Sequence, residues 1–268
     1  MIYIENMEKY VVITSDDFGI CHSVNKGILK GFTHGVLSSS NFMATTPWFP
    51  EAIRFTKEND LPIGVHLTLT CEWSNLKHRP LTNAASLMDK DGYFFSSYEE
   101  LFKHINFNEA KNEYIAQIEK VLGTGVRPTH VETHMCPPIT HDKFPEVYYR
   151  VADVVREVAK KYDLIYTYDT EQYKHKYFND VFELTKRDYS AIINSLKGLQ
   201  SGIYHIICHC GIDNEELRNL STVNEPVYTW GAAARQNDLD IITSKRFKNF
   251  LKEEGFTIIG IRELLDLI

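Results

Sequence analysis

The sequence predicts an α/β fold, namely an irregular TIM-like (β/α) barrel of about seven parallel strands with helices on the outside. Short apolar runs alternate along the chain with segments whose apolar residues recur every three or four positions. About seven repeats of this unit favour a barrel over an open sheet. The length of 268 residues is also typical of one α/β barrel.

The expected strands are short runs rich in apolar and β-branched residues. They cover residues 11–15, 36–44, 63–69, 128–134, 164–168, 203–209 and 256–261. The first expected helix carries Val24, Ile28 and Phe32 on one face and ends near Gly35. The other expected helices cover residues 47–57, 108–122, 145–161, 188–196, 240–254 and 262–268.

One domain spanning residues 1–268 is the simplest organisation, because no linker rich in Pro, Gly or Ser and no internal repeat divides the chain. Between about residues 71 and 107 the regular pattern gives way to turn residues and aromatics. We interpret this stretch as an insertion or lid within the barrel.

Composition excludes several classes of protein. The formal net charge is -7 and no basic run occurs, which argues against nucleic acids and anionic membranes as partners. No stretch approaches the roughly 18 apolar residues of a membrane span, and the N-terminus lacks the pattern of a signal peptide. Five irregularly spaced cysteines favour reduced thiols. We therefore expect a cytoplasmic protein.

Polar side chains gather at the ends of four expected strands. The carboxyl ends of barrel strands face the active site, and catalytic metal sites on this architecture combine Asp, Glu and His from several strands. The candidate residues are Asp16, Asp17, His66, His130, Glu132, His134 and His209.

The adjacent carboxylates Asp16 and Asp17 also have a structural interpretation, because Asp is a good N-cap for the helix that follows. Neighbouring side chains diverge at a strand end, so the two need not face each other. A nearby cation would hold Asp17 ionised and offset their repulsion. His66 sits between apolar neighbours, and a lone histidine in such a position is more often a core residue bonded to the backbone.

Strand alternation bears on the other histidines. His130 and His134 lie four residues apart and share a strand face, which is either a ligand pair or a polar surface. The consecutive residues Cys208, His209 and Cys210 could be read as a group of metal ligands. Alternation places the two cysteines opposite His209, so we interpret them as buried reduced thiols.

Four motifs together resemble a known family. SDDFG at 15–19, GVH at 64–66, THVETH at 129–134 and CH at 208–209 resemble, in order and spacing, the YdjC-like carbohydrate deacetylases, also called the chitooligosaccharide deacetylase (ChbG/HpnK) family. The resemblance extends from residue 11 to about residue 261. It implies a hydrolase of carbon–nitrogen bonds that removes N-acetyl groups from amino sugars or short oligosaccharides, releasing acetate, with one divalent metal ion.

The resemblance also implies roles for individual residues. Asp16 would be the general base, and His209 would donate or orient a proton. The metal ligands would be Asp17, His66 and His134.

The chain departs from the family pattern in three places. Glu132 stands where the family often has Asp, Cys136 where it often has another His, and Cys210 where it usually has Pro. These departures leave every proposed ligand in place and bear on the surrounding groups and on substrate choice. His130 matches the first His of the same motif and is a weaker candidate ligand.

The metal and the substrate stay open at this point. One carboxylate and two imidazoles suit Zn²⁺ better than Mg²⁺, whereas the family resemblance implies Mg²⁺. The same residues would serve a hydrolase of another amide or of a phosphoester, and a non-catalytic sugar-binding homologue is a further alternative. The expected partner is a small carbohydrate, and a homodimer is left open.

Other residues are weighed for substrate contact. Arg235, expected in a loop, would bind a polar group of the substrate or pair with Asp238. Aromatic residues in or near expected strand-end loops could contact a sugar ring. They are Trp48, Trp73, Tyr93, Phe94 and Trp230.

Overall fold

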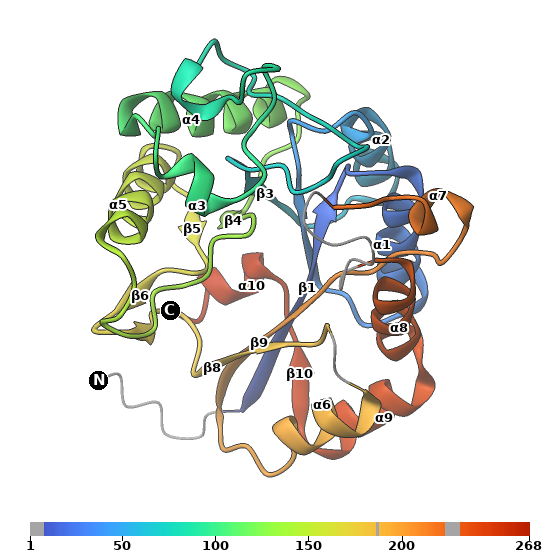
Figure 1. The fold of residues 1–268 in the computed structure, drawn as a ribbon. Helices are drawn as coiled ribbons and strands as arrows, with labels where there is room; N and C mark the ends of the chain where they lie inside the picture. The colour runs from blue at the N-terminus through green and yellow to red at the C-terminus, as the bar shows by residue number, and fades with distance from the viewer. Residues whose placement is uncertain (1–7, 186–187, 223–230) are drawn as a thin grey trace.

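Eight strands form one sheet that curls into a half-barrel in the computed structural model, which describes residues 8–185, 188–222 and 231–268 (Figure 1). The strands are β1 (Lys9–Phe18), β2 (Ser39–Phe42), β3 (Ile63–Leu67), β4 (His130–Thr133), β5 (Ile165–Tyr166), β8 (Asp180–Glu183), β9 (Gly202–Cys208) and β10 (Phe256–Ile258). Their order is β5-β4-β3-β2-β1-β9-β8, with β10 beside β1, and every pairing is parallel. The predicted irregular TIM-like barrel is confirmed.

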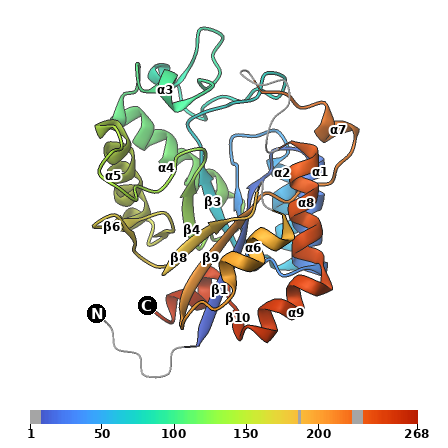
Figure 2. The ribbon, with the colours of Figure 1, turned by 60° about the horizontal axis from the view of Figure 1, so that its bottom comes forward.

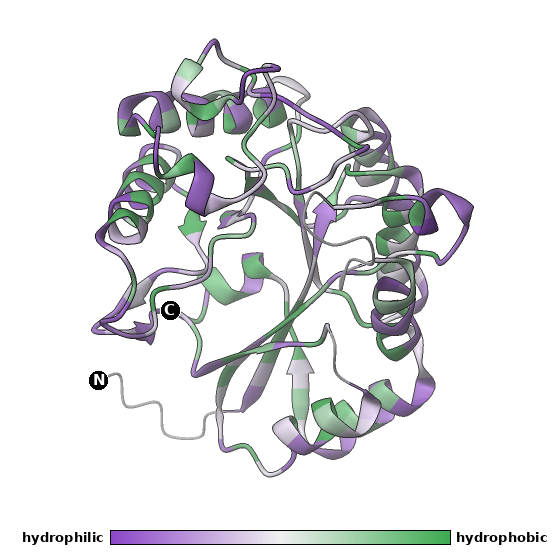
Figure 3. Cartoon of the chain, viewed as in Figure 1, coloured by the Kyte–Doolittle hydropathy of each residue, from purple (hydrophilic) through white to green (hydrophobic). Residues whose placement is uncertain are grey.

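Helices cover the outside of this sheet (Figure 1). Helices such as α5 carry stripes of hydrophobic and hydrophilic residues (Figure 3), and every buried residue of α5 is a valine or an alanine. None of the helices in the described part of the chain combines the length and hydrophobicity needed to cross a membrane. The helices are α1 (His22–His34), α2 (Phe49–Asn59), η1 (Ala85–Leu87), α3 (Tyr98–Leu101), α4 (Phe107–Gly123), α5 (Glu146–Lys161), α6 (Tyr189–Leu196), α7 (Glu215–Arg218), α8 (Ala232–Thr243), α9 (Lys245–Glu253) and α10 (Ile261–Leu265).

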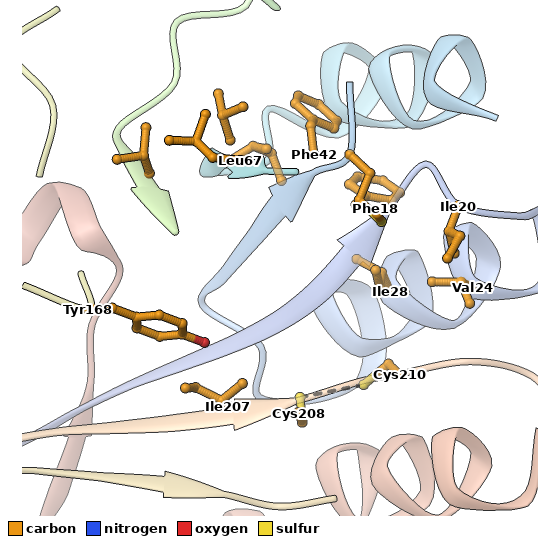
Figure 4. Packing of buried hydrophobic residues seen from close by; sticks show 14 of the residues in the cluster. Phe18, Ile20, Val24, Ile28, Phe42, Leu67, Tyr168, Ile207, Cys208 and Cys210 are labelled. Carbon is orange, nitrogen blue, oxygen red and sulfur yellow. Dashed lines mark hydrogen bonds between the residues drawn. The ribbon is translucent and has the colours of Figure 1, made fainter. Parts of the chain in front are cut away.

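The two ends of the half-barrel differ in polarity. At the amino ends of the strands, Ile261 and Leu264 of α10 join Val12, Ile165 and Ile203 in one apolar cluster. Figure 2 shows α10 in red beside the C-terminus, level with the lower parts of β9 and β1. At the carboxyl ends of β1 and β2, the rings of Phe18 and Phe42 stack with centroids 5.5 Å apart (Figure 4). The carboxyl ends carry the polar residues described below.

Several predicted elements need correction. The single helix expected at 240–254 is wrong, because Ser244 ends α8 and its hydroxyl caps α9 by accepting the backbone N–H of Phe247 at 3.1 Å. Strand β8 was missed because it is short and mostly exposed or half-buried. The antiparallel hairpin of β6 (Thr170–Glu171) and β7 (Lys174–His175) was also missed.

The segment at 71–107 packs onto the barrel. Trp73, Leu87 and Phe94 are fully buried and belong to the main hydrophobic core. Trp73 also pairs through a β-bridge with Thr222, on a loop distant in sequence. One domain with this insertion stays our proposal for the organisation of the chain.

Candidate metal centre

A β-bulge at the end of β1 sets the direction of the two adjacent carboxylates. Between the paired positions Ser15↔Ser40 and Phe18↔Phe42, β1 contains one residue more than β2. Asp17 lies in the left-handed region with φ of 70°, and an extra residue of this kind re-aims side chains. Asp16 and Asp17 both line one cavity, and each has its own hydrogen-bond partner, Asn41 for Asp16 and Arg235 for Asp17.

Neither Asp16 nor Asp17 caps helix α1, so the interpretation of this pair as an N-cap is wrong. Helix α1 begins after Cys21, whose side chain makes no capping bond. The carboxylate of Glu216 instead accepts the backbone N–H groups of His22 and Ser23, at 3.3 and 2.7 Å.

Three side chains present ligand atoms to one point. Asp17 Oδ1 lies 3.6 Å from His66 Nε2 and 3.4 Å from His134 Nδ1. Ligands about 2.1 Å from one tetrahedral ion are separated by roughly 3.4 Å. Among the described residues, the buried Asp17 Oδ1 has no hydrogen-bond partner, as expected of an atom positioned to bind a cation. These residues fit a divalent metal ion.

The two histidines of this group have pKa values shifted in opposite directions. Burial lowers the pKa of His66 to about 3, so its ring is neutral and offers a lone pair. Burial also disfavours the charged form of His134, yet Glu72 and Asp17 raise its pKa to about 10. Glu72 Oε2 lies 3.0 Å from His134 Nε2. A cation would therefore replace a proton on His134.

Arg235 belongs to helix α8 rather than to a loop, which corrects the sequence prediction. Its buried guanidinium donates to Asp17 Oδ2 at 2.6 Å. Although burial opposes ionisation, Arg235 and His134 hold the pKa of Asp17 well below its usual range. Asp17 Oδ2 is thus occupied, and Oδ1 faces the two imidazoles.

Asp16 has a separate set of partners. Asn41 Nδ2 donates to Asp16 Oδ1 at 2.8 Å and to Glu132 Oε2 at 2.7 Å, and Thr167 donates to the other oxygen of Glu132 at 2.6 Å. Burial and the charge of Asp16 raise the pKa of Glu132 well above its usual range. The neutral form of Glu132 is therefore favoured beside Asp16. Burial raises the pKa of Asp16 as well, which His209 partly offsets.

His209 follows β9 and is held by a short hydrogen-bonded chain. The Thr185 hydroxyl donates to Asp238 Oδ2 at 2.8 Å and lies 2.8 Å from His209 Nδ1. Because that hydroxyl has one proton, it accepts Nδ1–H from His209, and Nε2 keeps its lone pair. Burial lowers the pKa of His209 to about 4, below the near-neutral value expected from the residue type.

Asp238 gives a testable pH dependence. Burial raises its pKa to about 6, so between about pH 4 and pH 6 the native state binds a proton that the unfolded chain has lost. The free energy of unfolding should fall as pH rises through this window. Asp238→Asn removes this pH-dependent contribution, which is about 3 kcal/mol for a pKa raised from 3.8 to about 6. Urea unfolding across pH 4–7 measures it, and identical pH slopes in variant and wild type would contradict it.

His130 lies deeper in the barrel than the candidate centre. Its Nδ1 is 2.8 Å from Thr129 Oγ1 and its Nε2 is 3.5 Å from Ser39 Oγ. Four strand residues span about 13 Å, so His130 and His134 can share a face without sharing a site. Among the described residues, His130 is in neither cluster able to hold a metal; the second cluster is Asp16, His66 and Glu132.

The cavity above the centre has a volume of about 350 Å³. Of the candidate residues, it is lined by all except His130 and Glu132, and also by the unpredicted Glu72, Tyr168 and Glu183. Tyr168 and Ile207, both in its wall, lie near β1 and β9 (Figure 4). The wall contains none of the four described aromatic candidates, and Trp230 lies outside the described residues.

The two cysteines beside His209 face away from this cavity. Cys208 and Cys210 are buried, with sulfur atoms 3.8 Å apart (Figure 4). Alternation along β9 correctly placed them together, and all five cysteines are free.

Fold and site together define an α/β half-barrel protein with a buried carboxylate–histidine centre at its carboxyl end. The chain belongs to the YdjC-like protein family, whose model matches residues 10–253.

Named relatives agree with this membership. A carbohydrate deacetylase of Listeria welshimeri is 29% identical, with 95% of this chain and 99% of the relative covered. One from Clostridium beijerinckii is 26% identical with the same coverage. A solved Enterococcus faecalis structure, named for cellobiose-phosphate cleavage, shares the fold with a TM-score of 0.80 at 24% identity, covering 96% of this chain and 99% of that one.

Proposed function

We propose that the protein is a hydrolase that removes the N-acetyl group from an amino sugar or a short N-acetylated oligosaccharide, using one divalent metal ion. The observation that carries this proposal is the position of Asp17 Oδ1. This buried oxygen lies between two imidazole nitrogens and has no hydrogen-bond partner in the described part of the chain. The relatives named carbohydrate deacetylases support the substrate class.

Asp17, His66 and His134 would hold the ion. When bound, a divalent ion polarises an amide carbonyl and lowers the pKa of water. One oxygen and two nitrogen donors suit Zn²⁺, and Mg²⁺ remains the alternative from family resemblance.

Asp16 is the proposed general base. Its carboxylate lines the cavity beside the ligands, and Asn41 orients it. A pKa raised by burial brings a carboxylate closer to the range in which it accepts protons at neutral pH. Glu132, whose neutral form is favoured, would lie beside it without adding a second full negative charge.

His209 is the proposed route by which a proton reaches the leaving amine. The Asp238–Thr185 chain holds Nδ1–H and leaves Nε2 as the atom able to accept and return a proton. Because burial keeps His209 neutral, we propose that it relays a proton rather than starting as an imidazolium.

The rest of the cavity suits a sugar. Its wall combines the apolar faces of Tyr168 and Ile207 with His175 and Glu183. Small-molecule sites commonly pair apolar surface with a few polar groups that fix orientation.

Acetate release tests the proposed activity. Purified protein should release acetate from N-acetylglucosamine oligomers, lose that activity with a chelator, and regain it when Zn²⁺, Co²⁺ or Mg²⁺ is added back. Activity that survives complete metal removal would contradict metal dependence. No acetate from any sugar despite bound metal would favour another amide, a phosphoester or a non-catalytic sugar-binding role.

A further inference from the structure

The imidazole of His134 is held between two carboxylates. Its Nε2 lies 3.0 Å from Glu72 Oε2, and its Nδ1 lies 3.4 Å from Asp17 Oδ1. All three side chains are buried. The two ring nitrogens therefore face different partners, one in the candidate metal centre and one outside it.

We propose that Glu72 is a positioning residue for the metal centre, accepting Nε2–H from His134 so that Nδ1 presents its lone pair to the divalent ion. This inference rests on the proposed function. A neutral imidazole has one N–H and one lone pair, and an ionised carboxylate can only accept. Glu72 therefore selects the tautomer of His134.

His66, the other histidine of the candidate centre, differs from His134 in the partners of its ring nitrogens. His66 turns Nε2 toward Asp17, and its Nδ1 has no hydrogen-bond partner among the described residues. The two histidines thus use opposite nitrogens, and a carboxylate orients His134. A residue that hydrogen-bonds to a metal ligand without touching the ion typically contributes 10–100-fold to metal affinity.

Glu72 is held in place by its own neighbourhood. The next residue, Trp73, is fully buried and pairs with Thr222. Ser74 donates its backbone N–H to Ser221 at 2.8 Å. Because these contacts fix the backbone around Glu72, its carboxylate can direct His134 before any ion binds.

Zinc affinity of the full-length, metal-free protein tests this role. The variants are Glu72→Ala, Glu72→Gln and a control, Glu109→Gln. Glu109 accepts hydrogen bonds from Ser86 in the same insertion, at 2.9 and 2.7 Å. Competition with a chelator of known affinity should show about 10–100-fold weaker zinc binding in Glu72→Ala. Glu72→Gln should lose less, because its amide oxygen still accepts a weaker, uncharged bond. The control should match wild type.

A spectroscopic measurement distinguishes the loss of the Glu72–His134 contact from a general destabilisation of the variant protein. In zinc-loaded wild type labelled with ¹⁵N-histidine, NMR should show a protected Nε2–H on His134. This signal should exchange rapidly in Glu72→Ala and persist in Glu109→Gln.

The outcomes separate the two proposals. Wild type that binds no divalent ion would overturn the proposed function. Wild type that binds zinc, with Glu72→Ala binding equally well, would overturn the positioning role alone. If Glu72→Ala does not fold, Glu72→Gln decides: affinity equal to wild type overturns the role, and weaker binding supports it.

Discussion

Replacing Asp16 with asparagine is expected to lower kcat for acetate release by about 10²- to 10⁴-fold while metal content stays at the wild-type level. Asparagine matches aspartate in shape, but its amide cannot accept a proton from water. Asp16 is held by Asn41, and it is not one of the three residues whose ligand atoms surround the proposed metal position. Steady-state kinetics and elemental analysis of the same preparation measure both quantities.

Two results would contradict this assignment. A kcat close to wild type would show that Asp16 is not the base. Loss of metal from Asp16→Asn would assign Asp16 to the ion itself, for which the second cluster, with His66 and Glu132, provides the alternative ligands.

His134→Ala should abolish stoichiometric metal binding. We expect a loss of affinity beyond the roughly 100-fold upper range seen when only an outer partner of a ligand is removed, because the variant loses the ligand itself. Elemental analysis after purification and competition with a chelator measure the loss.

His130→Ala is the matched control, since it removes a buried histidine from the same strand at a deeper level. It should retain metal, with folding checked by circular dichroism. Metal retained in His134→Ala and lost in His130→Ala would move the ligand assignment to His130.

The barrel could be predicted from the sequence because it depends on local patterns. Strand and helix periodicity in the first half of the chain gave elements close to β1, α1, β3 and α4. Strand ends also identified the residues that line the cavity, because parallel strands deliver their carboxyl ends to one edge.

Contacts between distant residues could not be predicted this way. Arg235 reaches Asp17 across 218 positions, and Glu72 reaches His134 across 62. Neither pair belongs to a shared motif, and the extra residue of β1 beside Asp16 and Asp17 cannot be predicted from strand alternation. Gly19, directly after β1, has φ of 110°, and a Cβ there would lie 3.2 Å from Phe49 Cα, so the turn that follows the bulge favours glycine.

The bulge also limits how this chemistry can change by mutation. Substitution at Asp16 or Asp17 alters one functional group and leaves the other in place. Inserting or deleting a single residue between Ser15 and Phe18 would instead shift the register with β2 and turn side chains to the opposite face. The two carboxylates therefore depend on the bulged backbone to reach the cavity together. A related barrel that carried the same two residues without the bulge would place only one of them in its cavity.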